Sequence, residues 1–149
     1  IRIARLTQTI GPGISYNDSR IAAMFARSVI EKRDIQLLTD GQTRRNTVYV
    51  ADAVSAILYI MIKGEDGCAY NIADKNSFLT IKETAQMIAR DIAKGAIEVR
   101  LENKKNSMYA VNDSLCLNMS TDEIESLGWS AIFSIEDSYR RMIAYLIRD

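Results

Sequence analysis

The sequence predicts an α/β fold in which parallel strands are joined by crossover helices. Two apolar patterns alternate along the chain: short runs that suit strands, and longer stretches in which apolar residues return every three or four positions. A strand that leads through a helix to the next strand is the unit of a parallel sheet. The length of 149 residues is enough to bury a core and suggests one domain, residues 1–149.

The first predicted strand leads through a tight loop into a helix. Residues 1–8 are apolar and alternate well enough for a strand, and the segment Gly11–Gly13, with a proline between its glycines, ends it. We expect Asp18 or Ser19 to cap the following helix, because their side chains can accept the free N–H groups of a first turn. Residues 35–38 are predicted to form the next short strand.

Residues 39–54 combine a turn, a strand and the start of a helix. Asp40 and Gly41 are typical of a turn, because glycine tolerates positive φ and aspartate can bond the nearby backbone. Residues 48–50 suit a strand. Asp52 is expected to cap a helix that ends near Gly64.

A basic pair, Arg44 and Arg45, lies between this turn and this strand. The pair stands at the rim of an ordered unit and not in a run of solvated charges. An arginine held there could bind a phosphate group with two parallel hydrogen bonds. The pair is therefore a candidate ligand contact.

The second half of the chain continues the alternation. Residues 70–73 are predicted to form a strand parallel to residues 1–8. Thr80 and Glu83 have the spacing of a capping box, which predicts a helix start. Residues 97–101 alternate as a half-exposed strand should.

Two more helix starts are predicted near the end of the chain. Ser120 and Glu123 have the spacing of a second capping box, with Gly128 placed to end that helix. Ser134 is expected to cap the last helix. Trp129 is interpreted as a core or hinge anchor in preference to a stacking platform.

Charge and composition exclude several functional classes. The 19 basic residues equal the 19 acidic ones, which removes the electrostatic argument for a nucleic-acid or anionic-membrane partner. Histidine is absent, which excludes a Ser-His-Asp triad and any histidine-dependent metal site within these residues. Cys68 and Cys116 have neither zinc-site nor disulfide-framework spacing. No apolar run reaches membrane-spanning length, and we expect a soluble, cytoplasmic protein.

Four blocks of the chain resemble motifs of the extended short-chain dehydrogenase/reductases, the NAD-dependent epimerases and dehydratases that act on nucleotide sugars. The block from Gly41 to Asp52 is similar to the family's G-x-Q-x-R-D-F-V-Y-V-x-D. The other blocks are Arg5–Gly13, similar to R-L-x-N-x-x-G-P-G, Tyr70–Ala73, similar to Y-N-I-G, and Leu127–Trp129, similar to L-G-W.

The resemblance implies the C-terminal portion of a Rossmann-type epimerase/dehydratase: two parallel strands with crossover helices plus a small α/β substrate-binding subdomain. No G-x-G-x-x-G is present, so NAD would be bound mainly by an N-terminal half outside this chain, and no catalytic residue is expected here. The implied activity is epimerisation or dehydration of a nucleoside-diphosphate sugar, which is oxidoreductase-type chemistry in an isomerase or a lyase. A homo-oligomer is expected.

The resemblance also assigns roles to individual residues. Arg45 would bind the diphosphate, and Gln8, which stands where the family usually has Asn, would contact the substrate near the sugar. Gln36 and Leu38 would line the nucleotide base. Lys105 either substitutes for a second phosphate-binding arginine of the family or belongs to a solvated loop.

One match to a catalytic motif is rejected, and two other interpretations stay open. Tyr59 and Lys63 fit Tyr-x-x-x-Lys, but they follow the Arg45 block, whereas the family's pair precedes the block that here begins at Arg5. The rivals to an enzyme part are a non-catalytic nucleotide-sugar-binding or regulatory module, and an interaction domain that pairs through an exposed sheet edge.

Overall fold

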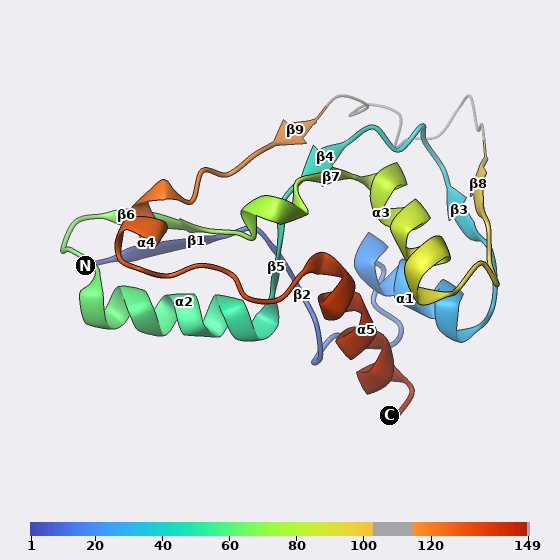
Figure 1. The fold of residues 1–149 in the computed structure, drawn as a ribbon, viewed down its shortest axis with the longest axis horizontal. Coiled ribbons are helices and arrows are strands. Elements are labelled where there is room, and N and C mark those ends of the chain that lie inside the picture. Colours follow the sequence, from blue (N-terminus) through green and yellow to red (C-terminus); the bar gives the residue numbers. More distant parts are fainter. Residues whose placement is uncertain (103–114, 149) are drawn as a thin grey trace.

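The computed structural model describes residues 1–102 and 115–148, and it is a mixed α/β fold with two hydrophobic cores (Figure 1). We call the two parts the α2 lobe and the α1 lobe. The α2 lobe contains β1 (Ile3–Leu6), α2 (Val50–Lys63), β6 (Ala69–Ile72) and α4 (Asp122–Ser126). The α1 lobe contains α1 (Ile21–Ile30), β3 (Ile35–Leu37), α3 (Ile81–Met87), the π-helical turn η2 (Ile88–Ile92), β8 (Val99–Leu101) and α5 (Ile135–Leu146).

Short strands connect the lobes. They are β2 (Gln8–Ile10), β4 (Arg44–Arg45), β5 (Thr47–Tyr49), β7 (Leu79–Thr80) and β9 (Cys116–Leu117), with the 3₁₀ turn η1 (Lys75–Ser77) before β7. Ile10 of β2 packs in the core of the α1 lobe, and Val48 of β5 packs in the core of the α2 lobe. Within the described residues, no helix combines the length and the apolar character needed to cross a membrane.

The predicted parallel pairing is confirmed, with one correction. β1 pairs with β6 in parallel, Ile3 opposite Ala69, as expected for residues 1–8 and 70–73. The predicted strand 1–8 is, however, two strands, because the chain changes partner at Thr7. The Thr7 N–H still donates to Ile72 O of β6 (3.1 Å), whereas its hydroxyl donates to Asn46 O (2.7 Å), and β2 then pairs with β5.

The last three pairings complete the sheet topology. β3 pairs with β8 in parallel, which confirms the strands predicted within residues 35–38 and 97–101. β4 lies between two neighbours, β7 antiparallel and β9 parallel, so that the basic pair is held on both sides by backbone pairing.

Two predicted helix caps are wrong because the acidic side chains have other partners. Arg20 occupies the N-cap of α1 without a side-chain cap, and Asp18 instead accepts the Arg20 N–H at 2.8 Å. The Arg20 guanidinium beside Asp18 lowers the pKa of that carboxyl to about 2. α2 begins at Val50, so Asp52 lies inside the first turn, where its buried carboxylate accepts N–H groups from Ile132 (3.2 Å) and Phe133 (3.0 Å).

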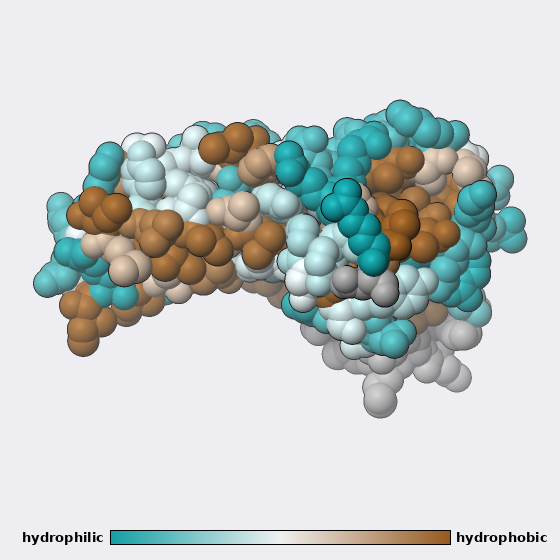
Figure 2. Space-filling model, turned by 90° about the horizontal axis from the view of Figure 1, so that it is seen from below, coloured by the Kyte–Doolittle hydropathy of each residue, from teal (hydrophilic) through white to brown (hydrophobic). Residues whose placement is uncertain are grey.

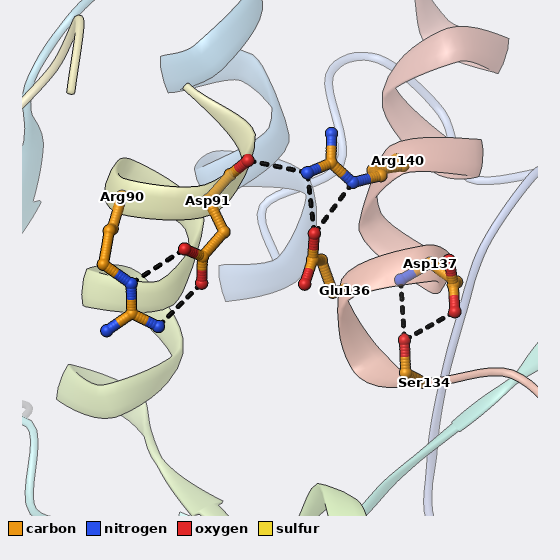
Figure 3. Close-up of polar contacts among 6 residues, drawn as sticks. All are labelled: Arg90, Asp91, Ser134, Glu136, Asp137 and Arg140. Atoms are coloured by element: carbon orange, nitrogen blue, oxygen red, sulfur yellow. Dashed lines mark hydrogen bonds and ion pairs between the residues drawn. The ribbon is translucent and has the colours of Figure 1, made fainter. Parts of the chain in front are cut away.

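Two predicted caps are confirmed and one is displaced. The Thr80 hydroxyl accepts the Glu83 N–H at 2.9 Å and the Glu83 carboxylate accepts the Thr80 N–H at 2.7 Å, a complete capping box. Ser134 caps α5 by accepting the Asp137 N–H (3.1 Å; Figure 3). The box predicted at Ser120 is wrong, because Thr121 is the N-cap of α4 and makes no side-chain cap.

The C-terminal segment is fastened to both lobes. Trp129 is 5% exposed in the core of the α2 lobe, and its Nε1–H donates to Ser55 Oγ at 2.9 Å, which confirms its interpretation as an anchor. On the other side, Arg140 of α5 donates through Nη2 to Asp91 O of η2 and to Glu136 Oε1, both at 2.6 Å (Figure 3). α5 therefore packs against η2 through a polar clamp as well as through its apolar face.

Gly11 is expected to tolerate no side chain. Its φ is +141°, and a Cβ there would lie 2.8 Å from Val50 Cγ1 and 2.9 Å from Tyr49 Cε2. We expect Gly11→Ala to lower the free energy of unfolding by roughly 2 kcal/mol, from backbone strain plus overpacking. Gly13, with φ +94° and open space around it, is the matched control, since Gly13→Ala adds strain without the clash. Equal losses in urea unfolding would contradict the steric argument.

Candidate functional site

Arg45 lies beside a small internal cavity between the strands and the helices of the α1 lobe. The cavity has a volume of about 20 Å³. Its polar lining comes from Gln8 of β2, Arg45 of β4, Thr47 of β5, Thr84 of α3 and Tyr139 of α5. The remaining lining is apolar and comes from β2, α1, β7, α3 and α5.

Backbone pairing places these side chains together. Gln8 lies opposite Thr47 in the β2–β5 register. Arg45 precedes Thr47 by two positions, and side chains two apart in extended chain point to the same side. The structure therefore brings together Gln8 and Arg45, two residues that the sequence assigned to one ligand site from separate motifs.

The Arg45 guanidinium has unused hydrogen-bonding capacity. Its Nε is buried and has no hydrogen-bond partner among the described residues. Buried donors are normally paired, and an unpaired one in a native fold calls for an explanation. An Nε–H that lacks an acceptor among the described residues can donate to an oxygen of a ligand phosphate.

Tyr139 is a neutral donor at the same cavity. The side chain is 3% exposed, and burial raises the pKa of its hydroxyl, an effect that nearby Arg45 opposes only in part. The phenol therefore keeps its proton at neutral pH and can donate. The sequence predicts neither Tyr139 nor Thr84 as a site residue, because neither stands in a recognisable motif.

Arg44, in contrast, is already engaged. Its Nη2 forms an ion pair with Glu83 Oε1 at 3.2 Å, and its guanidinium lies over the Phe78 ring at 5.3 Å. The pKa of Glu83 is lowered, first by the Thr80 N–H of the capping box and then by Arg44. The two arginines of the basic pair thus differ: Arg44 ties β4 to the start of α3, and Arg45 faces the cavity.

A buried polar cluster surrounds Asn46, the residue after Arg45. Asn46 is fully buried; its Nδ2 donates to Asp74 O (3.2 Å), and its Oδ1 accepts the Met119 N–H (2.9 Å). Ser77 Oγ lies within hydrogen-bond distance of both Thr47 N (2.7 Å) and Thr47 O (3.0 Å). Burial raises the pKa of the Asp74 carboxyl, and the negative charge of Asp52 adds to that shift.

The other predicted ligand contacts lie apart from this cavity. Gln36 is exposed and lines a separate hollow of about 520 Å³ between α1 and β3. Leu38 is 38% exposed just after β3, and it lines neither the hollow nor the Arg45 cavity. Lys105 lies outside the described residues. Gln36 and Leu38 are not brought to Arg45, because β3 pairs with β8 and not with β2, β4 or β5.

The rejected Tyr-x-x-x-Lys pair lies on α2, in the other lobe. The Lys63 Nζ stands 4.7 Å from the centroid of the Tyr59 ring and donates to Leu127 O at 3.5 Å. Neither residue lines the Arg45 cavity. Within residues 1–102 and 115–148, no group of three or more Asp, Glu, Cys or His side chains is arranged to hold a metal ion.

Comparison with known proteins identifies the family that the chain resembles. Residues 1–73 match the NAD dependent epimerase/dehydratase family. This match confirms the resemblance to that family that the four motif blocks predicted. It is 30% identical over 144 residues to UDP-glucuronic acid decarboxylase 4 of Arabidopsis thaliana, covering 96% of this chain and 31% of the relative. It is 27% identical over 148 residues to UDP-D-apiose/UDP-D-xylose synthase 1 of the same plant, covering 90% and 38%.

Solved structures show the same fold. UDP-glucose 4-epimerase from Thermotoga maritima superposes with a TM-score of 0.77 at 21% identity, over 99% of this chain and 46% of that one. dTDP-glucose 4,6-dehydratase from Bacillus anthracis superposes with a TM-score of 0.76 at 18% identity, over 99% and 45%. The architecture is thus that of Rossmann-type epimerases and dehydratases, and the chain spans less than half the length of these proteins.

Proposed function

We propose that this chain is the nucleotide-sugar-binding part of an NAD-dependent epimerase or dehydratase. The observation that carries the proposal is Arg45, whose buried Nε has no hydrogen-bond partner among the described residues and whose side chain lines one cavity with Gln8. In this role Arg45 binds the diphosphate and Gln8 contacts the substrate near the sugar. The cavity of about 20 Å³ holds roughly one water molecule, so this binding requires the cavity to widen around the ligand. Gln36 and Leu38, which lie apart from the Arg45 cavity, would line the base.

The names of the relatives support the substrate class. The Arabidopsis relatives are named for UDP-glucuronic acid, UDP-apiose and UDP-xylose, and the Thermotoga epimerase structure is described as containing UDP-glucose. Those names share a nucleoside diphosphate. A site built around one arginine suits that shared group, since a guanidinium binds phosphate oxygens in a bidentate manner.

The residues of this chain do not fit a dinucleotide cofactor by themselves. A dinucleotide site needs a G-x-G-x-x-G turn between a strand and a helix. The turn between β2 and α1 has Gly11 and Gly13 but Tyr16 in place of the third glycine. We propose that NAD, which the family name implies, is bound mainly by protein outside these 149 residues. The role of this chain is then to hold the nucleotide sugar in register with the cofactor, and positioning of this kind contributes large rate factors. Its cytoplasmic location stays a prediction.

Titration calorimetry with UDP and with uridine tests this proposal. UDP is expected to bind the protein at least tenfold more tightly than uridine, because only UDP has the phosphates that Arg45 would contact. Equal affinities for the two, or no binding of UDP at concentrations up to several millimolar, would contradict a nucleoside-diphosphate site.

We also propose that this chain forms a homo-oligomer through the α2 lobe. The Ile3 N–H donates to Cys68 O, just before β6, and the Thr7 N–H donates to Ile72 O of β6, so the N–H groups of the alternate residues point to the other edge of β1. Figure 2 shows hydrophobic side chains gathered over the same lobe. Exposed apolar residues there are Ile1, Ile3, Leu6, Val54, Ile57, Leu58, Met61 and Ile62.

Light scattering over a concentration series is expected to show association of the 149-residue chain. Covering about 400 Å² of apolar surface is worth on the order of 10 kcal/mol, against an association cost of roughly 4–15 kcal/mol. Met61→Glu should shift the equilibrium to monomer, whereas Ile147→Glu, a similar change at the end of α5, should not. A monomer at every concentration would refute this interface.

A further inference from the structure

Asn46 stands where the family pattern R-D-F has its aspartate, next to Arg45. We infer that Asn46 is a positioning residue for Arg45, and that its surroundings in this protein require a neutral amide. The inference rests on the proposed function for the ligand that Arg45 binds, and on the structure alone for the hydrogen bonds. Asn46 itself lines no cavity described above, so it acts through its neighbour.

The Asn46 side chain both donates and accepts. Its Nδ2 donates to the carbonyl of Asp74 (3.2 Å), and its Oδ1 accepts the N–H of Met119 (2.9 Å). A carboxylate can accept the Met119 N–H, but it cannot donate to the Asp74 carbonyl and would face that oxygen with a negative charge. An amide matches both partners, which an ionised aspartate does not.

The same residue joins three segments that hold the site. The backbone carbonyl of Asn46 accepts the hydroxyl of Thr7, the residue before Gln8 (2.7 Å). Met119 follows β9, which pairs with Arg44 and Arg45 in parallel. Asp74 is the N-cap of the η1 turn. In that turn the Ser77 hydroxyl accepts the Thr47 N–H and lies within hydrogen-bond distance of the Thr47 carbonyl. Loss of the Asn46 bonds would therefore loosen Arg45 and Gln8 together.

The charges around Asn46 predict the behaviour of an aspartate there. Arg45 is its neighbour in the chain, and the buried Asp74, whose carboxyl is influenced by Asp52 and Lys75, lies across from it. Burial and the Asp74 carbonyl both disfavour the charged form of an aspartate at position 46. A protonated carboxyl, in contrast, can donate to Asp74 O and accept from Met119, as the amide does.

The difference in stability between the Asn46→Asp protein and the unchanged protein should consequently depend on pH. A carboxyl whose pKa is raised by folding costs no stability below its unfolded-state pKa of about 4, and the cost grows as the pH rises toward the folded-state pKa. Relative to the unchanged protein at each pH, Asn46→Asp should melt close to normally near pH 4 and several degrees lower at pH 7–8. Asn17→Asp, the same change at an exposed asparagine, should show no such trend.

UDP affinity shows whether Asn46 positions Arg45 or only stabilises the fold. At pH 7–8 and a temperature at which all variants are folded, Asn46→Asp should bind UDP about tenfold more weakly than the unchanged protein, with the ratio shrinking toward one as the pH falls. In an Arg45→Ala background the Asn46→Asp change should cost less than threefold, because its effect passes through Arg45.

The melting and binding experiments test three separate points: the neutral amide, the positioning of Arg45 and the UDP site. A pH-independent melting difference for Asn46→Asp would overturn the requirement for a neutral amide. A pH-dependent melting difference with unchanged UDP affinity, or an equal loss in the Arg45→Ala background, would overturn positioning of Arg45. Failure of the unchanged protein to bind UDP would contradict the proposed function, and positioning with it, while the melting series still tests the hydrogen-bond requirement.

Discussion

Arg45→Ala is expected to weaken UDP binding by about ten- to a hundredfold. The change removes a charge-assisted, bidentate contact to phosphate, which is worth roughly 1.5–3 kcal/mol. In the folded protein the Nε of Arg45 has no other partner within the described residues, so little stability is expected to be lost with it. The measurement is titration calorimetry of both proteins with UDP.

Arg44→Ala is the matched control for this prediction. Arg44 carries the same charge one residue away, but its guanidinium is paired with Glu83 and lies over Phe78. Its removal should reduce UDP affinity less than threefold, by weakening the general positive potential only. Arg45→Lys should fall between the two, since lysine keeps the charge and loses the bidentate geometry. Equal losses for Arg44→Ala and Arg45→Ala would show that the phosphate contact is assigned to the wrong residue.

Trp129→Ala is expected to cause the largest loss of stability, about 3–5 kcal/mol in the free energy of unfolding. Trp129 is 5% exposed in the core of the α2 lobe, and truncating a buried tryptophan leaves a cavity that the surroundings fill only in part. The ring also donates to Ser55 Oγ (2.9 Å), so the segment between α4 and α5 loses a tie to α2. Urea unfolding followed by circular dichroism measures the loss.

Ser55→Ala separates the hydrogen bond from the packing. It removes the acceptor of the Trp129 Nε1–H and keeps the ring, and it is expected to cost about 1–2 kcal/mol. A loss for Trp129→Ala no larger than that for Ser55→Ala would mean that the ring contributes little by packing. Trp129 would then not anchor the segment between α4 and α5 to the core of the α2 lobe.

Local sequence signals predicted much of the framework. Thr80 and Glu83 are three residues apart, and a capping box needs only that spacing and a free first turn, so the helix start could be read directly. Residues 70–73 formed a strand parallel to 1–8 because a helix between them dictates a crossover. The α/β class and the family followed from such local patterns.

Several local predictions were wrong because the side chains concerned contact partners far away in the sequence. Asp52 looked like a helix cap, yet its carboxylate accepts N–H groups from Ile132 and Phe133, about eighty positions later in the chain. Thr7 interrupts the predicted strand because Asn46, from another motif, accepts its hydroxyl. When a side chain has two possible hydrogen-bond partners, tertiary packing determines which of the two it contacts.

For the candidate site, too, part could be predicted from the sequence and part required the structure. The sequence by itself determined that Arg45 and Gln8 are candidates, because each stands within a recognisable motif. Only the tertiary structure decided that they share a cavity, that Arg44 is occupied by Glu83 and that Tyr139 joins the lining. The physical reason is that a motif records which chemical groups are present, whereas strand pairing and burial decide which groups meet and which of them are left without a partner.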